Sequence, residues 1–252
     1  MSFSVNSNTA AATANFHLNQ QNKSLGESIA FLSSGSKLGQ AAYDASSLTI
    51  ANQLSSQVSG MGQSIMNAND SIGMSQIAES GLSSINDNME QIRTLSIKAS
   101  SPIMNASNRA SIQKEINGLL EVSGSIASNS SFNGVKLLDG GSGSLANGNF
   151  SGSIDVMSED GLASALETID GELGRIGGSR SDIGASQNQL VSSIQSMSVS
   201  KINAASAESQ MRDVDFAKES ANFSAANLQS QIGSFTAAQA NAQASNVMRL
   251  FQ

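Results

Sequence analysis

The feature that most constrains this chain is a long helical repeat of apolar residues in its first half. From Leu54 to Ile92 these residues recur at alternating steps of four and three, with one short break. The spacing predicts one continuous helix from about Leu48 to Ala99. Such a helix is roughly 78 Å long, whereas a compact globule of this chain length is only about 45 Å across. We therefore expect an elongated, mainly helical molecule.

Composition and charge narrow the classes of function. Aromatic residues make up only 4% of the chain, so a large aromatic-lined ligand pocket is not expected. The net charge of −7 argues against a nucleic acid or an anionic membrane as partner. The chain has no cysteine and one histidine, His17, which excludes disulfides, thiolate sites and an ordinary zinc site. We expect no cofactor and no metal.

Catalytic and membrane patterns are missing as well. His17 lies between Phe16 and Leu18 in a polar segment, which does not suit the base of a Ser-His-Asp site. The glycines around Gly140 are not followed by the lysine of a phosphate-binding loop. No basic segment precedes an apolar run near the N-terminus, and nowhere do about 18 apolar residues occur together. The sequence predicts no enzyme, no cleaved signal peptide and no transmembrane span.

Both ends of the chain are poor in charge but carry apolar residues at helical spacing. Residues 1–35 contain two charged residues and residues 216–252 contain three. The pattern leaves two interpretations open. The terminal helices either fold onto their own domain or are covered on several sides in an assembly of many subunits. In the second case the polymerisation residues are Leu18, Leu25, Ile29, Leu32, Leu228, Ile232, Phe235, Met248, Leu250 and Phe251.

Between the ends the sequence predicts an antiparallel helical bundle with a small β tip. After a break at Pro102, Ser107 is the expected cap of another helix. Asn133-Gly134 predicts a tight hairpin turn, and Ile154–Met157 a further short strand. Helical spacing from Leu162 to Met197, interrupted by two glycines, predicts a second rod that runs back along the first.

The expected fold class is thus mainly α, an elongated antiparallel long-helix bundle or coiled coil with a β-hairpin tip. The two termini then lie side by side, so that the terminal helices are able to pair. The expected organisation is terminal helices at 1–44 and 207–252, a helical bundle at 45–206 and a tip at about 131–160.

Six segments, in order along the chain, resemble bacterial flagellin. They are LSSGSKL (Leu32–Leu38), ANDSIGMSQIAESGL (Ala68–Leu82), MEQIRTLSIKA (Met89–Ala99), SFNGVKLL (Ser131–Leu138), RDVDFAKE (Arg212–Glu219) and the ending NVMRLFQ. The family's variable outer insertion is replaced here by a Gly-Ser-Asn loop, so the resemblance implies a minimal, filament-core-only form. It implies a structural subunit that polymerises into the extracellular flagellar filament for motility. It also implies type III export through the flagellar apparatus without a cleaved signal peptide.

The resemblance further implies partners and sites. The partners are the chain itself, an export chaperone that binds the C-terminal helix from about Phe216, the filament cap and hook-associated proteins, and other flagellins. A vertebrate innate receptor reads the family's inner rod at the positions of Glu90, Gln91, Arg93 and Leu95. Immune-stimulating members have a basic residue in place of Gln91 and an acidic one in place of Thr94, while Arg93 and Leu95 match. Relatives are often O-glycosylated, and the tip offers Ser142, Ser144, Ser151 and Ser153.

Two alternatives to a filament subunit remain at this stage. A hook-filament junction protein has similar ends but is usually longer and less faithful to the inner-rod segments. A soluble coiled-coil adaptor also contains long rods, yet its flanking positions are normally charged, whereas here they are Ser, Asn and Gln.

Overall fold

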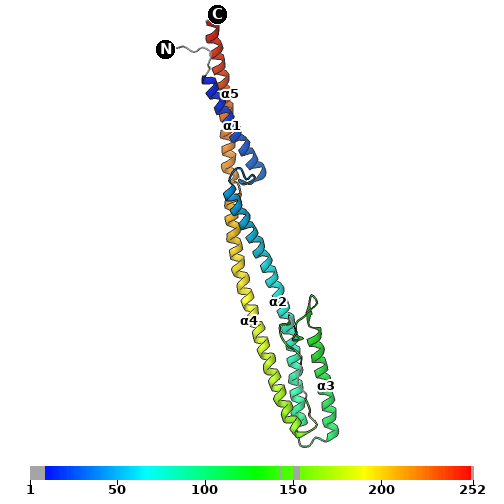
Figure 1. Ribbon diagram of the computed structural model, residues 1–252. Coiled ribbons are helices and arrows are strands. Elements are labelled where there is room, and N and C mark those ends of the chain that lie inside the picture. Colours follow the sequence, from blue (N-terminus) through cyan, green and yellow to red (C-terminus); the bar gives the residue numbers. More distant parts are fainter. Residues whose placement is uncertain (1–8, 142, 150–153, 251–252) are drawn as a thin grey trace. The chain divides into compact units, whose positions relative to one another are not determined.

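The structure is a computed structural model that describes residues 9–141, 143–149 and 154–250, without the side chains of residues 10, 247, 248 and 250. The elements of the described chain are five helices and one hairpin (Figure 1). In order they are α1 (Thr9–Ser34), α2 (Ala45–Ala99), α3 (Ala106–Asn129), β1 (Ser131–Phe132), β2 (Val135–Lys136), α4 (Glu159–Arg212) and α5 (Phe216–Leu250). The predicted class, mainly α with long antiparallel helices and a small hairpin, is confirmed.

The first long helix is continuous, as its apolar spacing predicts, but it begins a few residues earlier. Asp44 precedes α2, and its carboxylate accepts hydrogen bonds from the backbone N–H groups of Ser46 at 3.1 Å and Ser47 at 3.0 Å. These N–H groups have no partner inside the helix, so a carboxylate at this position fixes the first turn.

Three local expectations need correction. The cap of α3 is Asn105, whose side chain accepts from the N–H of Asn108 at 2.8 Å, and not Ser107. The second rod is one helix, α4, which continues through the Gly177-Gly178 pair. Ile154–Met157 forms no strand. Gln113 of α3 donates to the carbonyl of Ile154 and accepts from the N–H of Val156, both at 2.8 Å.

The chain divides into two compact units. We call residues 1–59 and 201–252 the terminal unit, and residues 60–200 the central unit. Helices α2 and α4 contribute residues to both units.

In the terminal unit, α1 and α5 lie side by side and antiparallel (Figure 1). Two hydrogen bonds donated by serine hydroxyls join the helices, and the residue number on α5 falls as the number on α1 rises. Asn22 accepts from the Ser230 hydroxyl at 2.8 Å, and Ser28 donates to the carboxylate of Glu219. The predicted pairing of the terminal helices is confirmed.

In the central unit, α2 and α4 are antiparallel, and α3 lies beside α2 (Figure 1). Arg93 of α2 contacts Asp170 of α4 at 2.7 Å, whereas the earlier Glu79 faces the later Arg180 at 3.9 Å. The core between these helices holds large apolar side chains that are less than 2% exposed. They include Leu82, Ile85, Met89, Ile92, Ile116, Leu137, Leu138, Val156, Ile169 and Ile176.

The predicted hairpin is present at its expected turn. Strands β1 and β2 pair antiparallel with Phe132 opposite Val135. Asn133 and Gly134 join them with positive φ angles of 49° and 80°. Two consecutive positive φ values are what a two-residue hairpin requires, and Asn-Gly adopts them at low cost.

Candidate assembly surface

The contact between α1 and α5 is built mainly from small side chains. Ala226 and Ala237 of α5 and Ala11 and Ser28 of α1 are each less than 9% exposed. Gly233 lies against Leu18, because a Cβ built on that glycine would be 3.4 Å from the leucine Cδ1 and 3.9 Å from its Cα. The small residues at these positions of α5 let the two backbones approach closely.

Three large apolar side chains of α5 point away from the seam. Leu228, Ile232 and Phe235 are 60%, 63% and 71% exposed. At about 100° per residue, these three positions lie on the face opposite Ala226 and Gly233. Helix α5 therefore has two apolar faces, and the chain itself covers only the one made of small residues.

Helix α1 repeats this arrangement in part. Leu18, Leu25 and Leu32 are half-buried, while Ile29 is 50% exposed. Phe16, on the opposite side of the helix from Leu18, is 67% exposed, and its ring meets that of His17 edge-on at 5.8 Å. We call five of the exposed apolar side chains on α1 and α5 the terminal apolar set, which consists of Phe16, Ile29, Leu228, Ile232 and Phe235.

The sequence pattern did not identify Phe16 as a surface residue, because it lies outside the leucine stripe. The remaining predicted polymerisation residues cannot be placed. Phe251 lies outside the described residues, and so do the side chains of Met248 and Leu250.

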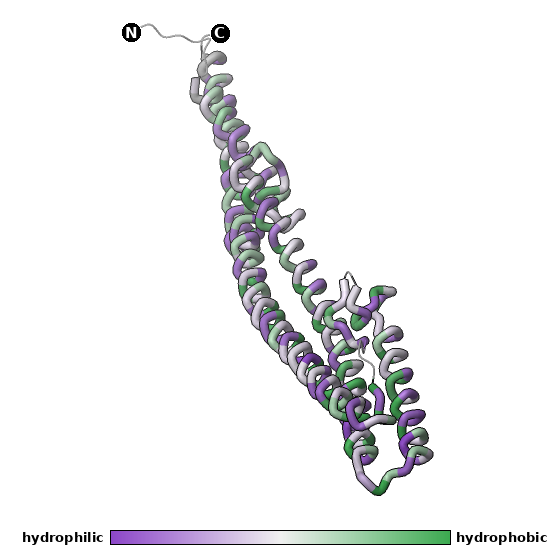
Figure 2. The backbone as a smooth tube through the Cα atoms, turned by 60° about the horizontal axis from the view of Figure 1, so that its bottom comes forward, coloured by the Kyte–Doolittle hydropathy of each residue, from purple (hydrophilic) through white to green (hydrophobic). Residues whose placement is uncertain are grey.

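The polar groups around the terminal apolar set are mostly neutral. The Thr13 hydroxyl donates to the carbonyl of Thr9 at 2.9 Å, and the Gln231 amide donates to Asn227 at 3.2 Å. In Figure 2 apolar and hydrophilic segments alternate along these helices. A neutral polar surface is cheaper to bury than a charged one, because no ion loses its hydration. The surface is therefore suited to a dry protein interface.

At the entry to α2, the Asp44 carboxylate is strongly anchored. The side-chain hydrogen bond from Ser47 is the largest of the interactions that lower the pKa of Asp44 from 3.8 to about 2. The N–H of Ser47 and the hydroxyl of Ser46 add to it. The adjacent Tyr43 ring meets Phe31 edge-on at 5.0 Å. These contacts connect the start of α2 to the end of α1 within the terminal unit.

The segment that resembles the receptor-binding region lies on α2 in the central unit. Glu90 and Gln91 are exposed, and Leu95 packs partly against the core. Arg93 donates to Asp170, and this hydrogen bond raises the pKa of Arg93 and holds that of Asp170 below its usual range. Three of these residues also line a shallow groove, whose lining consists of Asp87, Glu90, Gln91, Thr94, Leu95 and Glu115.

Among the candidate glycosylation sites, Ser144 is the one that the structure describes. Its hydroxyl donates to the carbonyls of Leu137 at 2.7 Å and Ala146 at 2.6 Å, and the side chain is half-buried. Ser142, Ser151 and Ser153 lie outside the described residues.

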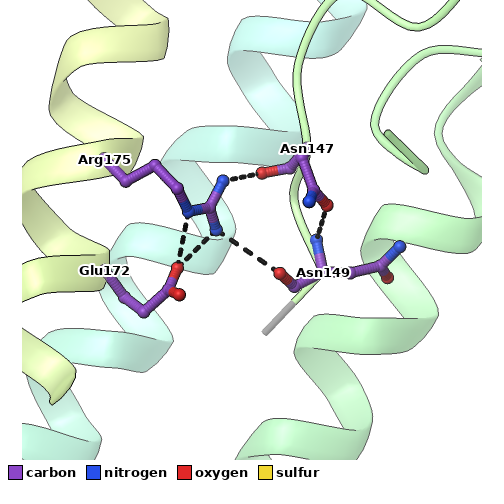
Figure 3. A network of polar contacts seen from close by, with 4 residues as sticks. All are labelled: Asn147, Asn149, Glu172 and Arg175. Carbon is purple, nitrogen blue, oxygen red and sulfur yellow. Dashed lines mark hydrogen bonds and ion pairs between the residues drawn. The ribbon is translucent and has the colours of Figure 1, made fainter. Parts of the chain in front are cut away.

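A polar network on α4, which sequence reasoning missed, holds the loop after the hairpin. Arg175 pairs with Glu172 one turn earlier and donates to the carbonyls of Asn147 and Asn149 (Figure 3). The available signal was an acidic and a basic residue three positions apart. This spacing indicates an ion pair within one helix, but not the contact of that pair with a distant loop. The network fixes the loop backbone against α4.

The part of the chain that the structure describes contains no group of three His, Cys, Asp or Glu residues arranged to hold a metal ion. In the same described part, no helix has the length and apolarity needed to cross a membrane.

Comparison with known proteins gives consistent matches over almost the entire chain. Residues 5–142 match the model of the bacterial flagellin N-terminal helical region, and residues 166–251 match that of the C-terminal helical region. The chain is 30% identical to a flagellar filament 31.3 kDa core protein of Treponema maltophilum, over 98% of this chain and 99% of that protein. It is 28% identical to a flagellin of Bacillus subtilis, with the same shares covered.

Proposed function

Because the chain belongs to the bacterial flagellin family and is a structural subunit of the flagellar filament, we propose that its terminal helices drive polymerisation. Helices α1 and α5 would act together, with the terminal apolar set in contact with neighbouring copies. The observation that supports this most strongly is the exposure of Leu228, Ile232 and Phe235 on a helix whose other apolar face is already paired.

Burial of large apolar side chains supplies the free energy for assembly. Each large apolar side chain that becomes fully buried contributes about 1.5–3 kcal/mol. A helical polymer repeats the same contacts in every subunit, so even partial burial of the terminal apolar set adds up along the filament. The scarcity of charge at both ends keeps the desolvation cost low.

Filament formation by altered chains tests the proposal. Deletion of residues 216–252 is expected to abolish polymerisation and leave a soluble subunit. Phe235→Asp is expected to act similarly, because an unpaired charge in a dry interface between subunits costs several kcal/mol. Since Phe235 is 71% exposed in the single subunit, this substitution leaves subunit folding intact.

Two variants serve as controls, and sedimentation after seeding is the readout. Phe235→Leu keeps an apolar side chain and should still pellet as filaments. Ile103→Asp puts the same charge at a 90% exposed position in the turn before α3, and should polymerise. If Phe235→Asp pellets with an unchanged critical concentration, the terminal helices are not the polymerisation element.

We also propose that an export chaperone binds α5 before assembly. The exposed face of Leu228, Ile232 and Phe235 is a hydrophobic stripe of the kind that helix-binding grooves recognise. The proposal places the chain outside the cell after export through the flagellar apparatus, without cleavage of a signal peptide. Co-purification of the chaperone with the full chain, and its loss with the 216–252 deletion, would support it. The filament cap, the hook-associated proteins and other flagellins are the further partners proposed.

A third proposal concerns the innate receptor of vertebrates. Glu90–Leu95 is the corresponding region, and the two departures at Gln91 and Thr94 are expected to weaken recognition. A double variant, Gln91→Arg with Thr94→Glu, restores both charge types on the exposed face of α2. A receptor reporter assay on monomeric protein should respond more strongly to the double variant than to the natural chain. An equal response would remove these two positions from the proposal.

O-glycosylation is proposed for the tip serines. A sugar on Ser144 would replace the hydroxyl hydrogen that bonds two carbonyls, so Ser142, Ser151 and Ser153 are the preferred acceptors. An intact mass of filaments from the native source equal to the unmodified 25.9 kDa chain would end the proposal.

A further inference from the structure

The dipeptide Asn-Gly occurs three times, at Asn117-Gly118, Asn133-Gly134 and Asn147-Gly148. In this dipeptide the backbone nitrogen of the glycine can attack the side-chain amide of the preceding asparagine, because no glycine side chain blocks the approach. The reaction needs a free backbone nitrogen and a mobile amide. The structure puts the three copies in different environments.

Two of the three copies are held in place. Asn117-Gly118 lies inside α3, where the glycine N–H belongs to the helical hydrogen-bond ladder and the Asn117 side chain accepts from Gln113 at 3.0 Å. The N–H of Gly148 donates to the carbonyl of Leu138 at 2.8 Å. The Asn147 side chain accepts from the N–H of Asn149 at 3.0 Å, and its carbonyl accepts from Arg175.

The third copy has none of these restraints. Asn133 and Gly134 form the exposed turn between β1 and β2. Apart from its two neighbours in the chain, no residue has an atom within 4 Å of the position where a Cβ on Gly134 would be. Across the described residues, neither the Asn133 amide nor the Gly134 N–H has a hydrogen-bond partner.

We propose that Asn133 is a site of spontaneous deamidation. The Gly134 nitrogen bonds to the side-chain carbon of Asn133, and the amide nitrogen leaves as ammonia, taking up the proton that the Gly134 nitrogen gives up. Water then opens the resulting five-membered imide. Cleavage on the side-chain carbonyl leaves aspartate, and cleavage on the main-chain carbonyl leaves isoaspartate, in which the chain continues through the former side chain. No oxidant or reductant takes part.

The isoaspartate product changes the hairpin. It inserts an extra backbone carbon into a turn of two residues, whose length sets the pairing of Phe132 with Val135. Phe132 packs partly against the core and lines a groove with Gly73 and Ile77 of α2. Loss of the hairpin register therefore loosens the contact of Phe132 with α2. Deamidation in the exposed turn is slow and irreversible, and it alters the packing of Phe132 at the edge of the core.

Peptide mass spectrometry of the full-length chain, aged in mildly alkaline buffer, tests this inference. In the folded chain, the mass gain of amide-to-acid conversion should appear at Asn133 roughly ten-fold or more faster than at Asn117 or Asn147, because the protected copies react only through local opening. In denaturant the three rates should converge. Equal rates in the folded chain, or a faster reaction at Asn117 or Asn147, would overturn the proposal.

A variant that keeps the hairpin turn but lacks the reactive amide provides a second test. Asn133→Gly retains two residues that accept positive φ but carries no side-chain amide. Because Asp-Gly pairs also form isoaspartate, the label is read in the tryptic peptide 115–136, which contains none of them. Enzymatic methylation of isoaspartyl groups with a labelled methyl donor should mark this peptide in the aged natural chain and leave it almost unlabelled in the aged variant. Equal labelling of the two peptides would refute the assignment to Asn133.

Discussion

The terminal and central units use their apolar residues in opposite ways. In the central unit the large side chains Leu82, Ile85 and Ile169 are fully buried among three helices. In the terminal unit the seam between α1 and α5 buries alanines, while Phe235 and Leu228 face outward. The central unit buries its large apolar side chains in its own core, whereas the terminal unit leaves several of its large apolar side chains exposed.

This difference shows how a polymer subunit can be soluble and still assemble. A helix pair joined by small residues gains little from folding alone, since alanine and serine bury little area. The central unit supplies most of the stability of the single chain. Assembly then becomes the step that buries the large side chains of the terminal unit.

The largest expected effect comes from separating the two units. A fragment of residues 46–206 should fold and remain mostly helical, because it retains the apolar core of the central unit. A peptide of residues 207–252 should be largely unfolded, since an isolated helix with few packing partners is marginal in water. Circular dichroism measures both. A random-coil spectrum for the fragment at moderate temperature would contradict the self-sufficiency of the central unit.

The next effect compares one large apolar residue from each unit. Ile85→Ala should lower the free energy of unfolding of the single subunit by about 2–5 kcal/mol, because it leaves a cavity in a packed core. Phe235→Ala should change it by less than about 0.5 kcal/mol, because the ring is already exposed.

Urea unfolding of monomeric protein and seeded polymerisation provide the two readouts. Phe235→Ala should raise the critical concentration for filaments, while Ile85→Ala should mainly lower the urea midpoint. If both variants changed the two readouts in the same way, Ile85 and Phe235 would not differ in being buried within the subunit or only on assembly.

Most of the fold follows from local signals in the sequence. The spacing around Leu82 and Ile92 predicts α2, and Asn133-Gly134 predicts the hairpin, because both signals depend on nearby residues. The continuity of α4 was not predicted at Gly177-Gly178. Two helical glycines cost about 1 kcal/mol each, and burial of Ile176 and Ile183 on either side offsets that cost.

The features that sequence reasoning missed depend on distant partners. The backbone of the Ile154–Val156 segment forms hydrogen bonds with the side chain of Gln113, and no pattern within the segment indicates this. The sequence predicted that the terminal helices are apolar and prone to assembly. It did not predict which face of each helix pairs within the chain. Small residues such as Ala226 give no strong hydrophobic signal, although they form the seam. Such contacts become visible only once the helices are brought together.

A smaller effect is expected when a glycine from each unit is replaced by alanine. A Cβ on Gly148 in the central unit would lie 2.9 Å from the Cδ1 of Ile85 and 3.2 Å from the Cβ of Leu138. Gly148→Ala should therefore cost about 1–3 kcal/mol through overpacking. In an Ile85→Val background, which lacks Cδ1, the cost of Gly148→Ala should be smaller.

At the terminal seam the glycine substitution should have the opposite sign. A Cβ on Gly233 meets Leu18 at an ordinary contact distance of 3.4 Å. Gly233→Ala should stabilise α5 by about 0.5–1 kcal/mol, because alanine loses less backbone entropy in a helix. Thermal unfolding followed by circular dichroism measures all of these variants. Destabilisation by Gly233→Ala as large as that by Gly148→Ala would mean that the seam is packed as tightly as the core.

The smallest effect is the response of the terminal unit to acid. The pKa of Asp44 is lowered to about 2 in the folded chain from a usual value of 3.8, with the Ser47 hydroxyl as the main cause. A lowered folded-state pKa means that the carboxylate stabilises the fold above about pH 4, and that this contribution is lost as the pH falls toward 2. Because Asp44 is exposed, the loss should be modest and confined to the first turn of α2. Amide hydrogen exchange measured between pH 5 and pH 2, corrected for intrinsic rates, should show Ser46 and Ser47 losing protection in the natural chain. Asp44→Asn keeps an amide oxygen that can cap the helix but does not titrate, so its protection should be nearly independent of pH over this range. If the two proteins lose protection in parallel, the acid response belongs to other carboxylates, and the start of α2 is held by packing and not by its cap.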